Sequence, residues 1–514
     1  MCLLKRYRVV GCWGYRSLRR CLTTYFCNFS TSNGSSGIGH YDLVVIGSGP
    51  AAQKCAIDAA KRNKSVALVD KNNMLGGVCV HTGTIPSKTF REAVLHLTSF
   101  RDQGFYGKPY FAGNLTVSDI LRRVTFVEEG ETRVVRDQLQ RNDIQTFKGR
   151  AKFLDQYTVE LELEDAPLAS KLISADHFLI ATGTRPVRRA DLPFDGKLCF
   201  DSDQLLRGEW RVPRDLIVAG GGVIGMEYAS MLSIIPGSRV TVIEEKENVL
   251  GFADREIVEG LCHVMRQQST RFLLNERISS VKVFSSKTGG KRLSVFLETG
   301  KVVHGDALLY TVGRQGNTDT LGLVSIGIQP NERGLIQVNQ YYQTTLPHIY
   351  AAGDCIGFPA LASTSMEQGR LASCHMFDKN SFPEGYKGIK QFPFGIYTIP
   401  EISLIGYSEE SLTAMRMSYE VGIARYKELA KGQMLGGGYG LLKILFDTRT
   451  HEILGVHCIG EGATEIIHIG QVAMDAKCPI EYFRDAVFNY PTMAEAYRVA
   501  AINGLQKTHD HVSA

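Results

Sequence analysis

The chain has 514 residues, 44% of them hydrophobic and 22% charged, so about two or three globular domains are expected rather than one. Its 52 glycines indicate many tight turns and close backbone contacts. No stretch of about 18 uninterrupted apolar residues occurs, which argues against a membrane-spanning helix.

The formal net charge of +5 comes from the N-terminal segment. Removing the six cationic side chains of residues 1–40 leaves 52 basic residues against 53 acidic ones, so the rest of the chain is close to neutral. Nothing in that balance favours nucleic-acid binding. The six cations are Lys5, Arg6, Arg8, Arg16, Arg19 and Arg20.

Residues 1–40 contain no acidic residue and end in hydroxyl residues and glycines, "TTYFCNFSTSNGSSGIG". This composition is typical of a mitochondrial transit peptide, which would place the mature protein in the mitochondrial matrix. A plastid leader or a disordered basic tail would have a similar composition. Residues 1–40 are therefore not expected to belong to the fold.

The 12 cysteines form no C-x-x-C pair and have irregular spacings. Cys55, Cys262, Cys374 and Cys458 stand among apolar neighbours, which indicates buried free thiols in a reducing compartment. Neither zinc-type cysteine spacing nor an H-x-x-x-H pair occurs, so no metal site is expected.

The first recognisable unit is "YDLVVIGSGPAAQKCAIDAAKRNKSVALVD", residues 41–70. It predicts a buried strand, a glycine turn, a helix and a second strand ending at Asp70. Gly47 permits the turn, Gly49 lets the backbone approach a pyrophosphate, and Ala52 is small enough for the helix to pack on the strand. Asp70 lies 23 residues after Gly47 and is placed to accept hydrogen bonds from a ribose.

The same pattern recurs at "RDLIVAGGGVIGMEYASMLSIIPGSRVTVIEE". Gly220, Gly222 and Gly225 form the second glycine fingerprint, and Glu244 follows the first of these glycines by 24 residues. Two independent fingerprints predict two bound dinucleotides.

Three later segments indicate that the second unit interrupts the first. "LIATGTRP" (Leu179–Pro186) and "HIYAAGDCIG" (His348–Gly357) each predict a strand that returns to the first sheet. "LLYTVGR" (Leu308–Arg314) would be the last strand of the inserted unit. The predicted class is α/β, with two Rossmann-like dinucleotide-binding domains of the three-layer ββα type.

From Tyr41 to about Gln506 the chain resembles the two-dinucleotide-binding flavoproteins, class I of the pyridine nucleotide-disulfide oxidoreductases. These include dihydrolipoamide dehydrogenase, glutathione reductase and the soluble pyridine nucleotide transhydrogenases. The resemblance implies FAD at the first fingerprint and NAD or NADP at the second. It also implies an α+β interface domain that begins near "GIYTIPEISLIGYSEESL" (Gly395–Leu412) and forms a homodimer or larger homo-oligomer.

The resemblance also implies how the chain is divided. Residues 41–186 and 315–388 would form the FAD-binding domain, residues 187–314 the NAD(P)-binding domain and residues 389–514 the dimerisation domain. Asp70 would bind the FAD adenosine ribose, and Asp354 the ribityl–phosphate region. Further cofactor-binding positions implied by the resemblance are Gly77, Cys79, Lys88, Gly183, Gly313 and Ala362.

The chain departs from the dithiol members of this family at two places. In "GGVCVHTGTIPSK" the first cysteine of the usual pair is present as Cys79, but Thr84 stands where the second belongs. In "NYPTMAE" Tyr490 replaces the histidine that serves as base in the dithiol enzymes. A threonine forms no disulfide, and a phenol, with an unperturbed pKa of about 10, is a poor base near neutral pH.

Both departures, and the motifs "H-x-G-T-I-P-S-K" and "F-N-Y-P-T-M-A-E-A-Y-R-V-A-A", resemble the soluble transhydrogenases. The implied activity is reversible hydride transfer between NADPH/NADP⁺ and NAD⁺/NADH through FAD, without a redox-active disulfide. One alternative is an NADH-dependent diaphorase or an enzyme like dihydrolipoamide dehydrogenase. Another is a non-catalytic flavin-binding partner.

By the same resemblance, Lys88 and Glu227 would form an ion pair beside the flavin, with Thr84 as a small polar neighbour and Cys79 as a passive thiol. Glu244 suits the ribose 2′-hydroxyl of NAD better than the 2′-phosphate of NADP. Lys246 and Arg255 are the nearby cations that could assist a phosphate. NADH is therefore expected to be used at least as well as NADPH.

Overall fold

A computed structural model of the chain describes residues 38–71, 74–101, 116–163, 170–208, 210–285, 290–384, 386, 391–436 and 438–510. Among these residues, no helix combines the length and the apolar character needed to cross a membrane. Residues 1–37 of the predicted transit peptide lie outside the described residues. The first strand starts within the predicted leader, because Gly39 and His40 pair with Ile173 and Ser174.

The first dinucleotide fold is built on parallel strands in the order β3-β2-β1-β5-β16. Residues 43–46 of β1 are at most 4% exposed, as expected of a strand covered on both faces. The strand β4 (Thr158–Leu163) pairs antiparallel with the outer halves of β3 and β5 and so adds a second β layer. The parallel strands are β1 (Gly39–Ile46), β2 (Val66–Asp70), β3 (Gln145–Phe153), β5 (Ser170–Ile180) and β16 (Ile349–Ala351).

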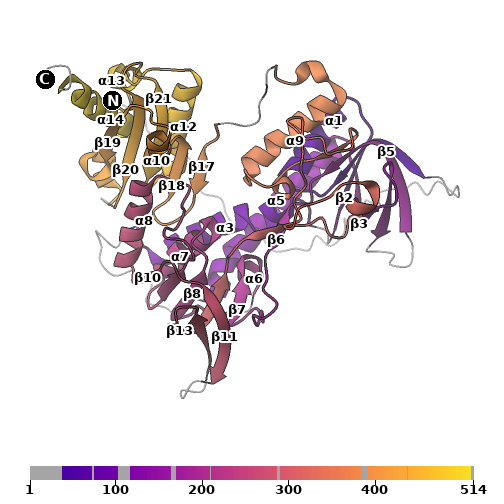
Figure 1. Cartoon of the computed structure of the whole chain (residues 1–514), viewed down its shortest axis with the longest axis horizontal. Coiled ribbons are helices and arrows are strands. Elements are labelled where there is room, and N and C mark those ends of the chain that lie inside the picture. Colours follow the sequence, from indigo (N-terminus) through magenta and orange to yellow (C-terminus); the bar gives the residue numbers. More distant parts are fainter. Residues whose placement is uncertain are drawn as a thin grey trace, which may run out of the picture. The chain divides into compact units, whose positions relative to one another are not determined.

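Helices supply the third layer of this fold. In Figure 1, α1 (Pro50–Lys61) and α9 (Ala362–Phe377) lie side by side. A Cβ at Gly369 would lie 2.0 Å from the carbonyl oxygen of Ala51, so only glycine allows this close helix packing. The other helices before the second fold are α2 (Gly77–His81), α3 (Thr84–Thr98) and α5 (Val117–Arg141).

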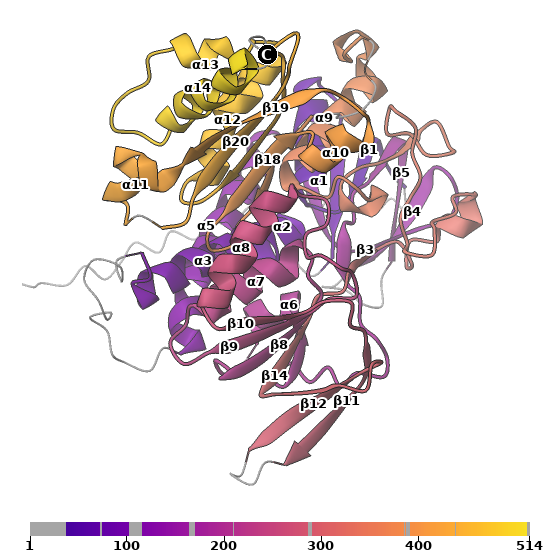
Figure 2. The same ribbon diagram turned by 60° about the vertical axis from the view of Figure 1, so that its left-hand side comes forward.

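The second dinucleotide fold has a five-stranded parallel sheet in the order β10-β9-β8-β14-β7. A small antiparallel sheet, β11-β12-β13, accompanies it, and Figure 2 shows β11 and β12 extending as a ribbon. The strands are β7 (Cys199–Asp201), β8 (Asp215–Ala219), β9 (Arg239–Ile243), β10 (Thr270–Leu273), β11 (Ile278–Ser285), β12 (Lys291–Leu297), β13 (Val302–Gly305) and β14 (Ala307–Tyr310). The helices are α6 (Ser202–Arg207), α7 (Val223–Ser233) and α8 (Arg255–Gln267).

The predicted interruption of the first fold by the second is confirmed, because β16 pairs in parallel with β5 after the whole second fold has passed. The connections differ from the prediction. "LIATGTRP" is not one strand: β5 ends at Ile180, Gly183 turns the chain with φ +62°, and β6 (Thr184–Pro186) follows. β6 pairs antiparallel with β15 (Arg314–Gly316), so the two chain crossings between the folds lie together.

The C-terminal part forms an antiparallel sheet in the order β17-β18-β21-β20-β19. Its helices α12 and α14 pack on this sheet around the fully buried side chains of Phe446, Phe483 and Tyr497. The strands are β17 (Phe394–Ile396), β18 (Ile402–Gly406), β19 (Tyr419–Arg425), β20 (Leu441–Asp447) and β21 (Ile453–Ile459). The helices are α10 (Glu409–Ala414), α11 (Ala430–Met434), α12 (Ala463–Asp475), α13 (Glu481–Asp485) and α14 (Glu495–Asp510).

The predicted fold class is confirmed: two dinucleotide folds are followed by an α+β C-terminal part that opens at the expected β17–β18 hairpin. Four short 3₁₀ helices complete the described elements: Leu323–Ile326, Asp354–Ile356, Lys379–Ser381 and Tyr426–Glu428.

Candidate functional site

A deep cleft opens at the carboxyl ends of β1, β5 and β16 in the first fold. Most of the residues predicted for FAD line it, although they come from segments more than 300 residues apart. Ala52 and Lys88 are the exceptions: Ala52 is fully buried inside α1, where its small size serves helix packing, and Lys88 is not among the residues of the cleft wall. The predicted residues in the cleft wall are Gly47, Gly49, Asp70, Gly77, Cys79, Thr84, Gly183, Asp354 and Ala362.

The glycine turn shapes one end of this cleft. Gly47 has φ +112°, and a Cβ there would lie 2.2 Å from the carbonyl oxygen of Ala181. Gly49 precedes α1 as its N-cap, and a Cβ on it would meet nothing within 4 Å, so its open side faces free space. The exposed N–H groups at the start of α1 therefore suit a bound pyrophosphate.

Two carboxylates stand in the cleft wall in a desolvated setting. Burial raises the pKa of Asp70 to about 6, against the opposing effect of a hydrogen bond from Ser48. Burial also raises the pKa of Asp354, which Arg314 and Thr184 partly offset. The Oγ1 of Thr182 is buried in the same wall and has no hydrogen-bond partner among the described residues. Two buried carboxylates and a hydroxyl in this wall can hydrogen-bond a ligand that carries ribose and ribityl hydroxyls, as FAD does.

Dithiol enzymes carry cysteines at two positions of this cleft, and in this chain only one of the two is a cysteine. Cys79 and Thr84 both line the cleft, and all cysteines among the described residues are free. Burial raises the pKa of the Cys79 thiol, while the side chain of Thr84 opposes that rise through a hydrogen bond. A thiol with a raised pKa is protonated and weakly nucleophilic near neutral pH. The four cysteines expected to be buried free thiols are buried and free.

Lys88 and Glu227 form the predicted ion pair and connect the two dinucleotide folds. Nζ of Lys88, on α3, lies 2.9 and 2.8 Å from the two carboxylate oxygens of Glu227, on α7. Glu227 is only 3% exposed and also accepts the backbone N–H of Tyr397 at 2.8 Å. The same Nζ lies 4.8 Å from the centre of the Tyr397 ring. The ammonium is thus fixed by a buried carboxylate and an aromatic face.

The second fingerprint has the steric features expected of a nucleotide-binding turn. A Cβ at Gly225 would lie 2.0 Å from the carbonyl oxygen of Gly220, so glycine allows α7 to pack on β8. A Cβ at Gly222 would meet nothing within 4 Å, which leaves the N-terminus of α7 open to a ligand. Gly220 itself has φ +102°. Gly313, also predicted for cofactor binding, has φ +138° and an open Cβ direction.

Glu244 follows β9 directly, and its carboxylate is held by the backbone. One oxygen accepts the N–H of Gly221 at 2.5 Å, and the other accepts the N–H of Lys246 at 2.9 Å. Of the two cations considered for a 2′-phosphate, Arg255 is engaged elsewhere: its Nε lies 2.8 Å from Glu259 on α8. Its side chain is nevertheless 66% exposed, so contacts of Arg255 and of Lys246 with a 2′-phosphate both stay predictions.

Two residues beside the cleft that the sequence reasoning did not single out are Ser48 and His81. Ser48 is the residue between the two glycines of the first fingerprint; it is 1% exposed, and its Oγ donates to the carbonyl oxygen of Met74 at 2.9 Å. His81 lies two residues beyond Cys79 and contacts Glu128. The sequence could have indicated Ser48, because a polar side chain in that glycine turn has few possible hydrogen-bond partners besides the neighbouring loop.

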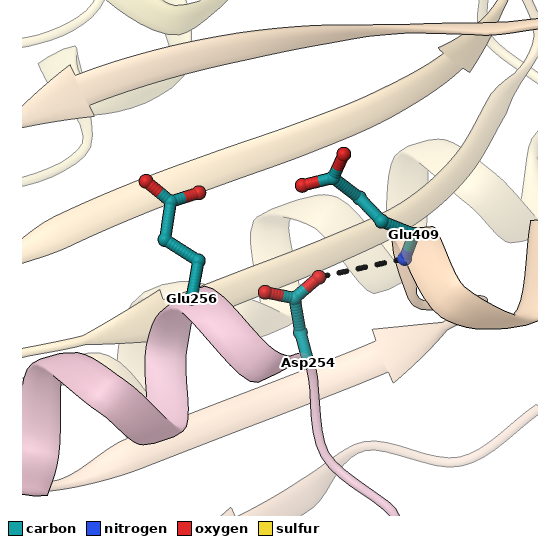
Figure 3. A group of neighbouring side chains, drawn as sticks. All are labelled: Asp254, Glu256 and Glu409. Atoms are coloured by element: carbon teal, nitrogen blue, oxygen red, sulfur yellow. Dashed lines mark hydrogen bonds between the residues drawn. The ribbon is translucent and has the colours of Figure 1, made fainter.

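An acidic trio elsewhere has the appearance of a metal site. Figure 3 shows the carboxylates of Asp254, Glu256 and Glu409 close together. The ammonium of Lys443 contacts all three, at 3.0 Å from Asp254 and from Glu256 and in a short contact with Glu409. Lys443 is itself fully buried, so the trio is compensated by a side chain rather than by an ion.

Comparisons with known proteins show which proteins this chain is similar to. The chain is 46% identical over 469 residues to a soluble pyridine nucleotide transhydrogenase of Mycobacterium tuberculosis, covering 91% of this chain and 97% of the relative. It is 43% identical over 471 residues to the protein of that name from Photorhabdus laumondii, covering 91% and 99%. Among solved structures, the HOCl-induced flavoprotein disulfide reductase RclA from Escherichia coli superposes with a TM-score of 0.78, at 26% identity, over 90% of this chain and 99% of that chain.

These relatives correct one prediction. The transit peptide and the mitochondrial matrix location find no support, because the matching transhydrogenases are bacterial proteins. An arginine-rich, acid-free composition alone was a weak basis for a compartment, since short basic tails share it.

The family comparison covers both parts of the chain. Residues 41–369 match the family described as pyridine nucleotide-disulphide oxidoreductase, and residues 392–501 match its dimerisation domain. Members use FAD and NAD(P), and the dimerisation domain indicates a homodimer. The cleft in the first fold, the glycine turn of the second and the ion pair between them suit those cofactors. On this agreement of sequence and geometry, the chain belongs to the pyridine nucleotide-disulphide oxidoreductase family.

Proposed function

We propose that this chain catalyses reversible, FAD-dependent hydride transfer between NADPH/NADP⁺ and NAD⁺/NADH, and that it does so without a redox-active disulfide. The names and identities of the bacterial relatives support the reaction. The observation that carries the second part is Thr84, which stands beside Cys79 in a cleft whose wall contains no other cysteine among the described residues.

Bound FAD supplies a carrier that takes hydride from one nicotinamide nucleotide and gives it to the next. The protein's own task is orientation and electrostatics. Lys88 provides a fixed positive charge where negative charge develops during reduction, and Glu227 keeps that ammonium oriented. Thr84 fills the position beside Cys79 with a small side chain that cannot exchange with a disulfide substrate.

One nucleotide site is used by both nicotinamide substrates in turn. The open N-terminus of α7 receives the pyrophosphate, and the Glu244 carboxylate accepts hydrogen bonds from the ribose hydroxyls. Because the Glu244 carboxylate is held by two backbone N–H groups, its displacement by a 2′-phosphate would cost those bonds. NADH is therefore the better or equal substrate, and Lys246 is the cation that makes NADPH acceptable.

The domain assignment follows the same proposal. Residues 41–186 and 315–388 bind FAD, residues 187–314 bind the nicotinamide nucleotide, and residues 389–514 join two copies of the chain or more. Large exposed apolar side chains in the last segment support this role, since Val487 is 92%, Tyr490 73% and Val472 67% exposed in the single chain.

The deciding experiment is NADPH-driven reduction of a thio-NAD analogue by purified holoprotein, with dihydrolipoamide as donor in a parallel assay. Fast thio-NAD reduction with negligible lipoamide turnover supports the proposal. Appreciable lipoamide turnover would favour the dithiol alternative. Anaerobic addition of NADH tests the third alternative, because a flavin that stays yellow would indicate a non-catalytic binding partner.

A further inference from the structure

Both ring nitrogens of His81 face hydrogen-bond acceptors. Nε2 lies 3.0 Å from the carbonyl oxygen of Leu75, and Nδ1 lies 2.6 Å from Oε1 of Glu128. A carbonyl oxygen only accepts, so Nε2 carries a hydrogen. A neutral ring would then present the lone pair of Nδ1 to the carboxylate. The second hydrogen bond therefore needs one further proton, held on the imidazole or on the carboxyl group.

This pair stabilises the turn that connects β2 to α2. Leu75 lies in the middle of the turn, and His81 holds it through its carbonyl oxygen. Ser48 holds both neighbours, since its Oγ donates to the carbonyl oxygen of Met74 at 2.9 Å and accepts the N–H of Gly76 at 3.2 Å. Three consecutive residues are thus each fixed by a side chain from outside the turn.

The Met74–Gly76 turn lies between two parts of the FAD cleft. It follows Asp70 and precedes Gly77, and both of these line the cleft. Gly77 approaches the first fingerprint so closely that a Cβ on it would lie 3.1 Å from Cα of Gly49. A shift of the turn would therefore move the cleft wall at the place where the glycine turn meets α2.

The hydrogen bond to Glu128 adds a third element. Glu128 lies in the middle of α5, its side chain is 34% exposed, and that of His81 is 11% exposed. A charge-assisted bond in such a shielded position is stronger than one in water. The imidazole thereby connects α5, α2 and the turn.

We propose that the proton shared by His81 and Glu128 fixes the Met74–Gly76 turn and so sets how slowly the protein releases FAD. Both are positioning residues, since neither lines the cleft. When this hydrogen bond is lost, the link between α2 and α5 is broken, and FAD leaves faster. The inference rests on FAD binding and not on the transhydrogenase reaction.

The test measures FAD release from holoprotein by the rise in flavin fluorescence. Glu128→Leu leaves Nδ1 of His81 without its partner and should release FAD about tenfold or more faster than wild type, which is the effect of losing one charge-assisted hydrogen bond. In Glu128→Gln the amide can donate to Nδ1 of a neutral ring that still donates to Leu75. This variant should release FAD about as slowly as wild type.

His81→Phe should also release FAD quickly, and Glu129→Gln, an exposed neighbour on α5, should behave as wild type. Slow release from Glu128→Leu or from His81→Phe would overturn the proposal, and so would release from Glu128→Gln as fast as from Glu128→Leu. If His81→Phe does not fold, the two Glu128 variants still decide. Since hydride transfer is not the readout, an error in the proposed reaction would leave this result unaffected.

Discussion

Glu227 is the residue whose surroundings constrain the site most closely. Its carboxylate is almost fully buried and receives three hydrogen bonds, two from Lys88 and one from the backbone of Tyr397. A buried carboxylate is tolerated only when its charge is compensated in this way. The pair therefore holds a cation at a defined position between the two dinucleotide folds.

Glu227→Gln should slow flavin reduction without removing the cofactor. The amide keeps the size of the side chain but no longer fixes the Lys88 ammonium, and a charge-assisted bond of about 1.5–3 kcal/mol is lost. Stopped-flow reduction by NADH under anaerobic conditions should be about 10- to 100-fold slower. Glu129→Gln is the matched control, because Glu129 is exposed on α5 and does not line the cleft. Equal rates for Glu227→Gln and wild type would contradict the proposed role.

Asp70 should make FAD binding weaker in acid. Burial raises the pKa of its carboxyl group in the cofactor-free cleft to about 6. Hydroxyl donors from a ribose stabilise the ionised form, so the pKa falls when FAD binds, and protons compete with FAD. Affinity is therefore full above about pH 6 and is lost as the pH falls through that value. Titration of apoprotein with FAD would measure this, and Asp70→Asn should bind weakly with little pH dependence.

At the level of elements, both nucleotide folds place a helix N-terminus against a glycine turn, and each glycine has a different physical function. The third glycine of the second fingerprint faces backbone, whereas the middle one faces open space. The fold requires a glycine at position 225, and ligand binding requires one at position 222. Substitution by alanine separates the two requirements.

Gly225→Ala should destabilise the protein, and Gly222→Ala should not. The added Cβ at Gly225 would lie 2.0 Å from a carbonyl oxygen that cannot move aside, so α7 must shift, at a cost of about 1–3 kcal/mol or more. The Cβ at Gly222 meets no protein atom but occupies the side from which a pyrophosphate would approach. Thermal unfolding should show a lower Tm only for Gly225→Ala, while Gly222→Ala should raise the KM for NADH at an unchanged Tm.

The elements around the two fingerprints were predictable because glycine spacing, buried strands and acidic strand ends are local patterns. The return of β16 to the first sheet was also predictable, from the two similar strand endings at Gly183 and Gly353. The break of "LIATGTRP" into β5 and β6 was not, since it depends on pairing with β15, which lies about 130 residues away.

The site residues also divide into those that could be predicted from the sequence and those that depend on packing between distant segments. Lys88 and Glu227 were predicted from resemblance, but the third partner of that pair, the backbone of Tyr397, depends on how the C-terminal part packs. The contact between His81 and Glu128 joins residues 47 positions apart on two helices, and no local pattern indicates it. Arg255 and Glu259 lie one helical turn apart on α8, so their ion pair follows from a local spacing, and a contact of Arg255 with a 2′-phosphate stays a prediction.

On the scale of the whole molecule, the second dinucleotide fold and the C-terminal sheet are joined by a buried charge cluster. Lys443 on β20 contacts Asp254 at the start of α8, Glu256 within α8 and Glu409 on α10. Burial lowers the pKa of Lys443, but hydrogen bonds and charges from these three carboxylates outweigh it, so the net pKa is raised and the lysine stays charged. The joint thus depends on one ammonium group.

Lys443→Met should weaken this joint strongly. The substitution keeps the length of an apolar side chain but leaves three carboxylates converging without a cation, and such a loss costs about 3–5 kcal/mol. Thermal unfolding should show a clear fall in Tm. Lys427→Met, at an exposed position near the end of β19, is the matched control. Adding Glu409→Gln to Lys443→Met should recover part of the loss, since it removes one of the repelling charges. A Tm for Lys443→Met equal to that of the control would show that the cluster contributes nothing to holding α8 against the C-terminal sheet.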